Sequence, residues 1–101
     1  MEPTFAFTSV LTDWEASKAV WVFATVPVDE ADEIRDIVPT KRGFGSVRVR
    51  ARIGDVEWRT SIFPDSKTGT YVLPLKKAVR KKAGVDLGDT IDLEIDVLIE
   101  D

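Results

Sequence analysis

The stretch YVLPLKKAVRKKAGVDLGDTIDLEI, residues 71–95, contains the signals that decide the fold. It opens with an apolar run that ends near Pro74, typical of a strand. It continues as a basic segment, residues 76–83, that is predicted to form a short helix closed by Gly84. After Gly88 and Asp89, residues 90–99 alternate apolar and polar side chains, which indicates a half-buried strand. The local order is therefore strand, short helix, glycine loop and strand.

The first half of the chain repeats this order. Gly54 and Asp55 form a strong two-residue hairpin signal between two β-rich runs, and the halves divide there. Each half is predicted to contain two strands, a short helix and a third strand, with a proline at or near the end of its second strand. The expected strands cover residues 4–11, 18–26, 47–53, 56–63, 70–75 and 90–99, and the expected helices cover residues 28–38 and 76–83.

This pattern predicts a mainly β protein with two short helices. We expect a double-split, six-stranded β-barrel built from two ββαβ halves, residues 1–53 and 56–101, related by a pseudo-twofold axis. A length of 101 residues fits one domain, residues 1–101, that buries a single core.

Three local features of the pattern have structural consequences. Asp29 is placed to cap the first helix, whose Ala31, Ile34 and Val38 share one face. Ile34 and Val79 are expected to face the interior from their two helices. Residues 18–26, KAVWVFATV, are β-branched and aromatic on both faces, which predicts a strand that is covered on both sides.

The composition limits the possible chemistry. The chain has no cysteine and no histidine, so it lacks a thiol nucleophile, a thiolate ligand and the commonest general base. We therefore expect no catalytic residues, no metal site and no cofactor. No apolar run is long enough to span a membrane, and the N-terminus does not resemble a signal peptide, so a cytoplasmic protein is expected.

The charges are segregated along the chain. Residues 41–82 hold twelve Lys or Arg and three Asp or Glu, whereas the rest holds two and fifteen, which gives −4 overall. Such blocks can form an anion-binding surface, or they can lie side by side and neutralise each other. The rows Arg48, Arg50, Arg52 and Asp92, Glu94, Asp96 favour the second interpretation if their strands are neighbours.

The hairpin register poses a sharper question. A two-residue turn places Ile53 opposite Val56, and it therefore places Arg50 opposite Arg59. Two facing guanidinium groups need an acceptor between them. We expect one of the carboxylates of residues 92, 94 and 96 to supply it, and a bound anion is the alternative.

Two further basic segments are candidate contacts for a partner. Arg80 lies on the basic helix, whose cations either touch phosphates or form a solvated face. Phe44 lies between glycines beside Lys41 and Arg42, so this loop either binds a partner or tucks one ring into the barrel end. The other aromatic residues are expected in the core or at the barrel ends. The candidate anion or partner site is thus Arg50, Arg59, Arg80, Lys41, Arg42 and Phe44.

The chain resembles the small bacterial and archaeal family known as domain of unknown function 1905. The resemblance rests on FAF near the start, on WVFATVP (residues 21–27) and on RTSIFPDSKTGTYVLPL (residues 59–75). The segment VRKKAGVDLGDTIDLEI, residues 79–95, completes it. It covers nearly the whole chain and implies a double-split β-barrel with no established activity.

Residues 80–95 also resemble the swapped-hairpin segment of AbrB-like regulators. The matching positions are Arg80, Ala83, Gly84, Val85, Gly88 and Asp89, whereas Pro74 stands two residues further from Arg80 than the family's proline. This local likeness implies an intertwined barrel more than it implies DNA binding.

These observations together predict a non-catalytic binding or interaction module. The alternatives are an AbrB-like DNA-binding regulator and a small enzyme that uses carboxylate and arginine side chains. The expected partner is a protein or a small anionic ligand rather than nucleic acid or a membrane, and the expected state is a monomer or a weak dimer.

Overall fold

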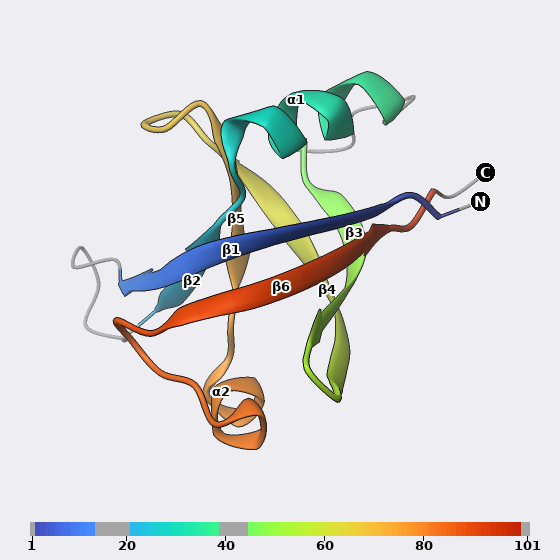
Figure 1. Cartoon of the computed structure of the whole chain (residues 1–101). Helices are drawn as coiled ribbons and strands as arrows, with labels where there is room; N and C mark the ends of the chain where they lie inside the picture. The colour runs from blue at the N-terminus through green and yellow to red at the C-terminus, as the bar shows by residue number, and fades with distance from the viewer. Residues whose placement is uncertain (1, 14–20, 39–44, 100–101) are drawn as a thin grey trace.

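A computed structural model of the protein describes residues 2–13, 21–38 and 45–99 (Figure 1). Six antiparallel strands close into a barrel in the order β1-β2-β5-β4-β3-β6, with two short helices, and this confirms the predicted fold class. The elements are β1 (Thr4–Asp13), β2 (Val22–Thr25), α1 (Val28–Ile37), β3 (Val47–Ile53), β4 (Val56–Asp65), β5 (Thr70–Pro74), α2 (Lys77–Ala83) and β6 (Thr90–Val97).

Two long strands, β1 and β4, each pair with two neighbours. β1 pairs with β6 through residues 4–10 and with β2 through residues 11–13. β4 pairs with β3 through residues 56–62 and with β5 through residues 63–65. Exchanging the two halves of the chain leaves this strand order unchanged, and the origin of the halves in a duplication stays a prediction.

The barrel interior is filled by the inward-facing residues of all six strands, because side chains on a strand alternate between the two faces. Where β1 leaves β6 for β2, the Ser9 hydroxyl accepts a hydrogen bond from the Thr25 amide at 3.1 Å. Among the described residues, no buried side-chain nitrogen or oxygen lacks a partner. The largest fully buried side chains are Leu11, Ile34, Ile62, Leu73, Leu93, Ile95, Val22, Val26, Val49 and Val97.

The β3–β4 hairpin has the predicted register. Ile53 lies opposite Val56, and Arg50 lies opposite Arg59. Gly54 takes a positive φ of 55°, a conformation that suits glycine at the first position of a two-residue turn. The turn therefore determines which side chains face each other along the whole hairpin.

Helix α1 follows β2 at one end of the barrel and contacts β5 (Figure 1). Its Ala31 and Ile34 are fully buried. The predicted cap at Asp29 is wrong, since Pro27 is the N-cap residue and no side chain bonds to the first turn. The Arg35 guanidinium lies 5.6 Å from the centre of the Tyr71 ring and donates a hydrogen bond to the Gly69 carbonyl, which fastens the helix to β5.

Helix α2 lies at the opposite end of the barrel and is attached differently (Figure 1). None of its residues is fully buried: Val79 is half-buried and fills the interior less than Ile34, which confirms the prediction for α1. Gly84 closes α2 in the left-handed conformation with φ 69°, as expected. With seven residues, α2 is too short to present a broad apolar face to the core.

Most element boundaries differ from the predicted ones by a few residues. Pro64, expected in a turn, lies within β4 opposite Tyr71, close to the end of that strand. β2 covers residues 22–25, and residues 18–20 of the strand predicted over 18–26 lie outside the described part of the chain.

Candidate functional site

The outer surface of the barrel divides into a charged and an apolar part. The outward residues of β6 and β3 lie side by side, with Arg50 opposite Asp96 and Arg52 opposite Glu94. Their opposite charges therefore meet across neighbouring strands, as predicted. We call this surface the charged face, and it consists of Arg48, Arg50, Arg52, Glu57, Arg59, Asp92, Glu94 and Asp96.

Asp96 is the centre of the charged face. Arg52 donates two hydrogen bonds to it, from Nη1 to Oδ2 at 2.7 Å and from Nη2 to Oδ1 at 2.9 Å. Arg50 Nη1 lies 3.3 Å from Oδ2, and the Thr4 hydroxyl donates to Oδ1 at 2.7 Å. The Asp96 side chain is only 9% exposed, because these partners cover it. Its carboxylate is therefore held as an anion by donors on three sides.

The pKa values on this face follow from those contacts. The hydrogen bonds from Arg52, helped by Thr4 and Arg50, hold the pKa of Asp96 well below its usual range although burial opposes this. The bonds to Asp96 and Glu94 raise the pKa of Arg52, and the bond to Glu2 followed by that to Asp96 raises the pKa of Arg50. The contacts therefore favour the charged form of each of these three groups.

The opposed arginines are only partly neutralised. Arg50 pairs with Glu2 at 2.8 Å and with Asp96, so one of the predicted carboxylates reaches Arg50, but the predicted bridge between Arg50 and Arg59 is wrong. Asp96 bridges Arg50 to Arg52 rather than to Arg59. Arg59 is exposed and has no ion pair with another residue of the described part of the chain.

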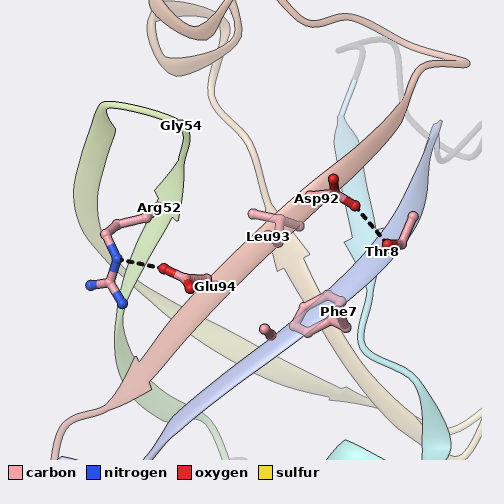
Figure 2. A pocket seen from close by; sticks show the side chains of 8 residues that line it. Phe7, Thr8, Arg52, Gly54, Asp92, Leu93 and Glu94 are labelled. Atoms are coloured by element: carbon pink, nitrogen blue, oxygen red, sulfur yellow. Dashed lines mark hydrogen bonds and ion pairs between the residues drawn. The ribbon is translucent and has the colours of Figure 1, made fainter.

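A hollow of about 460 Å³ lies beside the charged face, between the tip of the β3–β4 hairpin and the β1–β6 pair (Figure 2). Figure 2 shows Arg52 directed at Glu94, with Nε 3.1 Å from Oε1, and the Thr8 hydroxyl directed at Asp92, with 2.7 Å between the oxygens. The charged groups that line the hollow are thus already engaged, Arg52 with Glu94 and Asp92 with the neutral Thr8 hydroxyl. The hollow is lined by Ala6, Phe7, Thr8, Arg52, Gly54, Asp92, Leu93 and Glu94.

Arg80, predicted as a candidate contact, is used within the protein. Its Nε donates to the Leu75 carbonyl at 3.2 Å, and its Nη1 lies 3.0 Å from Asp86 Oδ1. The Leu87 amide and then Arg80 lower the pKa of Asp86. Arg80 therefore joins α2 to the preceding strand and to the following loop. The other three predicted contacts, Lys41, Arg42 and Phe44, lie outside the described residues.

The outward surface of β2, β5 and the adjoining ends of β1 and β4 carries mainly apolar side chains. Phe23 lies between Thr12 on β1 and Pro74 on β5, and Val72 lies between Thr25 and Phe63. Trp21, which is 51% exposed, stacks on Phe23 with the ring centres 6.3 Å apart. We call this surface the apolar face, and it consists of Val10, Trp21, Phe23, Phe63, Val72 and Pro74.

Sequence reasoning missed the apolar face as a surface. The signal was present, because residues 18–26 are apolar on both faces and were predicted to be covered on both sides. Val22 and Ala24 are indeed buried in the barrel. Trp21 and Phe63, however, are respectively 51% and 43% exposed. The inward side chains of β2 are therefore buried in the barrel, as predicted, whereas Trp21 on the outer side is largely exposed to solvent.

Two further findings concern the described part of the chain. It contains no group of three or more acidic, histidine or cysteine side chains arranged to hold a metal ion. Neither of its helices is long and apolar enough to cross a membrane.

Comparison with known proteins gives a family but no activity. No curated protein matches the chain. The family described as domain of unknown function (DUF1905) matches residues 7–95, which include most of β1, most of β6 and all the elements between them. Because this match covers most of the chain, the protein belongs to the DUF1905 family.

Proposed function

We propose that the protein is a non-catalytic binding module of the cytoplasm that holds a protein partner on its apolar face. The observation that supports this is the grouping of exposed apolar side chains. Three of the six exposed large apolar residues, Val10, Trp21 and Phe63, lie on the apolar face. Exposed apolar groups gathered on one surface are typical of a protein interface.

The charged face suits a partner less well. The guanidinium of Arg52 already forms ion pairs with Asp96, Glu94 and Glu57. That of Arg50 forms ion pairs with Glu2 and Asp96. A ligand at Arg50 or Arg52 would have to replace these contacts and would gain little, because each ion pair that it forms there breaks another. On the apolar face, Val10, Trp21 and Phe63 are exposed to water that a partner can displace.

The inventory of side chains also favours binding over catalysis. The chain has neither histidine nor cysteine, so its hydroxyl groups have no neighbouring imidazole to activate them. A small enzyme that uses carboxylates and arginines would have to rely on groups that already neutralise each other on the charged face.

Site-specific photo-crosslinking in living cells tests the proposal. A photoreactive phenylalanine analogue replaces Phe63 on the apolar face or, as the matched control, Arg59 on the charged face. We expect a discrete adduct from position 63 whose second component is identified by mass spectrometry, and none from position 59. Equal adducts from both positions, or an adduct from position 59 alone, would contradict the assignment.

A further inference from the structure

The two ends of the apolar face carry helices of opposite charge. β2 leads directly into α1 and β5 leads into α2, and these two strands are antiparallel neighbours. The helices therefore lie at opposite ends of the same strand pair (Figure 1). The backbone bond from the Leu75 amide to the Val22 carbonyl continues this register, which brings Lys76 beside Trp21. The apolar face thus ends in a basic border on one side.

The charges of the two helices match in number. α1 contains five acids and one arginine, a net charge of −4, whereas α2 contains four cations and no acid, a net charge of +4. Within the described residues, Arg35 pairs with Asp32 and Arg80 pairs with Asp86. The other charged side chains of the helices have no ion pair with a described residue: Asp29, Glu30, Glu33, Asp36, Lys77, Lys81 and Lys82.

We propose that the occupant of the apolar face is a second copy of this chain, an inference that rests on the proposed function above. Two copies pack face to face about a twofold axis that lies in the interface and runs across β2 and β5. This axis places each acidic α1 against the partner's basic α2. An axis that runs along the strands would instead place acid on acid and base on base, so the charges select one of the two arrangements.

The apolar and charged contacts have separate roles in this dimer. Trp21 and Phe63 supply exposed large side chains of the kind that dominate interface energies. The helix charges at the rim set the orientation and the rate of association, and salt screens them. The apolar residues explain why two copies adhere, and the helices explain which way round they meet.

Sedimentation velocity over protein concentrations from a few micromolar to several hundred micromolar tests the dimer. One variant reverses α1 with Asp29→Lys, Glu33→Lys and Asp36→Lys, and a second reverses α2 with Lys77→Glu, Lys81→Glu and Lys82→Glu. Each variant alone would place like charges together, so its dimer dissociation constant should rise at least tenfold over the wild type. An equimolar mixture of the two variants should form heterodimers, because every helix contact is then again between opposite charges.

Two further variants separate the apolar face from simple attraction between oppositely charged molecules. Val72→Lys places a charge in the middle of the apolar face and should abolish both the wild-type dimer and, when introduced into both variants, the heterodimer. Arg59→Glu on the charged face should change the dissociation constant less than twofold. Circular dichroism verifies the fold of each variant, and rescue by mixing excludes misfolding as the cause of a loss.

The outcomes distinguish this inference from the proposed function. A crosslinked adduct at position 63 that contains two copies of the chain supports both. A monomer at all concentrations, together with an adduct to a different protein, overturns the dimer and keeps the binding module. A monomer with no adduct at position 63 overturns both. A dimer that is insensitive to Val72→Lys places the interface elsewhere and overturns the inference.

Discussion

Asp96 joins three strands by side-chain contacts, since its carboxylate on β6 binds Arg50 and Arg52 of β3 and Thr4 of β1. Asp92 precedes it on the same strand and faces the same side of the sheet. It is exposed and accepts one side-chain hydrogen bond, from Thr8. The two aspartates therefore form a matched pair, with the same side chain and strand but different numbers of partners.

We expect Asp96→Ala to lower the free energy of unfolding by about 2 kcal/mol, because it leaves partly buried arginines without their shared acceptor. The control Asp92→Ala should cost less than about 1 kcal/mol, since water readily replaces an exposed partner. Urea denaturation of the three proteins measures the difference. Equal losses in the free energy of unfolding would mean that Asp96 stabilises the fold no more than an ordinary surface charge does.

Asp96 should also shape the acid stability of the barrel. Its pKa is lower in the folded state than the ordinary value of 3.8, so the folded state holds the charged form more tightly. The resulting stabilisation is complete above the unfolded pKa and is lost as the pH falls through the folded pKa. The free energy of unfolding should therefore decline below about pH 4 in the wild type and decline less steeply in Asp96→Asn. Parallel slopes for the two proteins would rule out this role.

The two helices differ in how the barrel holds them. α1 inserts Ile34, which is fully buried, whereas α2 has only half-buried apolar residues such as Val79. Ile34→Ala should cost about 2–4 kcal/mol by leaving a cavity, and Val79→Ala should cost about 1 kcal/mol or less. Thermal or chemical unfolding of both variants gives the comparison. Similar losses would show that α2 supports the core as much as α1 does.

α2 has no fully buried side chain, and the hydrogen bonds of Arg80 hold it in place instead. The bonds of Arg80 to the Leu75 carbonyl and to Asp86 fix both ends of the helix. Arg80→Met keeps an apolar stem but removes these bonds, so the α2 amides should exchange with solvent roughly tenfold faster while the β6 amides keep their protection. Hydrogen exchange detects this, with Lys81→Met as the exposed control. If amide exchange in α2 accelerates equally in both variants, Arg80 has no special role in holding the helix.

The sequence predicts some of these elements better than others, for physical reasons. The hairpin pairs, including Arg50 opposite Arg59, follow from a two-residue turn, which is a local signal. That Asp96 and not Asp92 joins the arginines depends on the register between β3 and β6, strands far apart in the chain. The cap of α1 was misassigned because Pro27 begins the helix before Asp29 is reached.

The candidate site was harder to predict than the fold. Arg80 was a candidate because a run of cations looks like a binding surface, but Asp86 and the Leu75 carbonyl engage it. The apolar face, by contrast, arises from strands of both halves of the chain, with Phe23 on β2 and Phe63 on β4. No local pattern shows that such residues will share one surface, because only closure of the barrel brings them together.

For the whole molecule, the segregated charges also bear on nucleic acid. The four cations of α2 are concentrated at one end, while the protein as a whole carries −4. We expect duplex DNA to bind no more tightly than about 1 µM near physiological salt, without sequence preference and with a steep salt dependence. Fluorescence anisotropy with unrelated duplexes measures this. A sequence-specific complex in the nanomolar range would instead support the AbrB-like regulator.

The pairing of β1 with β6 has a consequence for how the chain folds during synthesis. Thr4 and its partner Asp96 are 92 residues apart, so β1 is made early and its neighbour comes last. At ribosomal rates, β1 waits on the order of ten seconds for β6. Meanwhile β3, β4 and β5 can assemble through local hairpins, while β6 is still absent from the barrel wall. The nascent chain must therefore keep an apolar strand in solution until the final strand emerges and closes the wall.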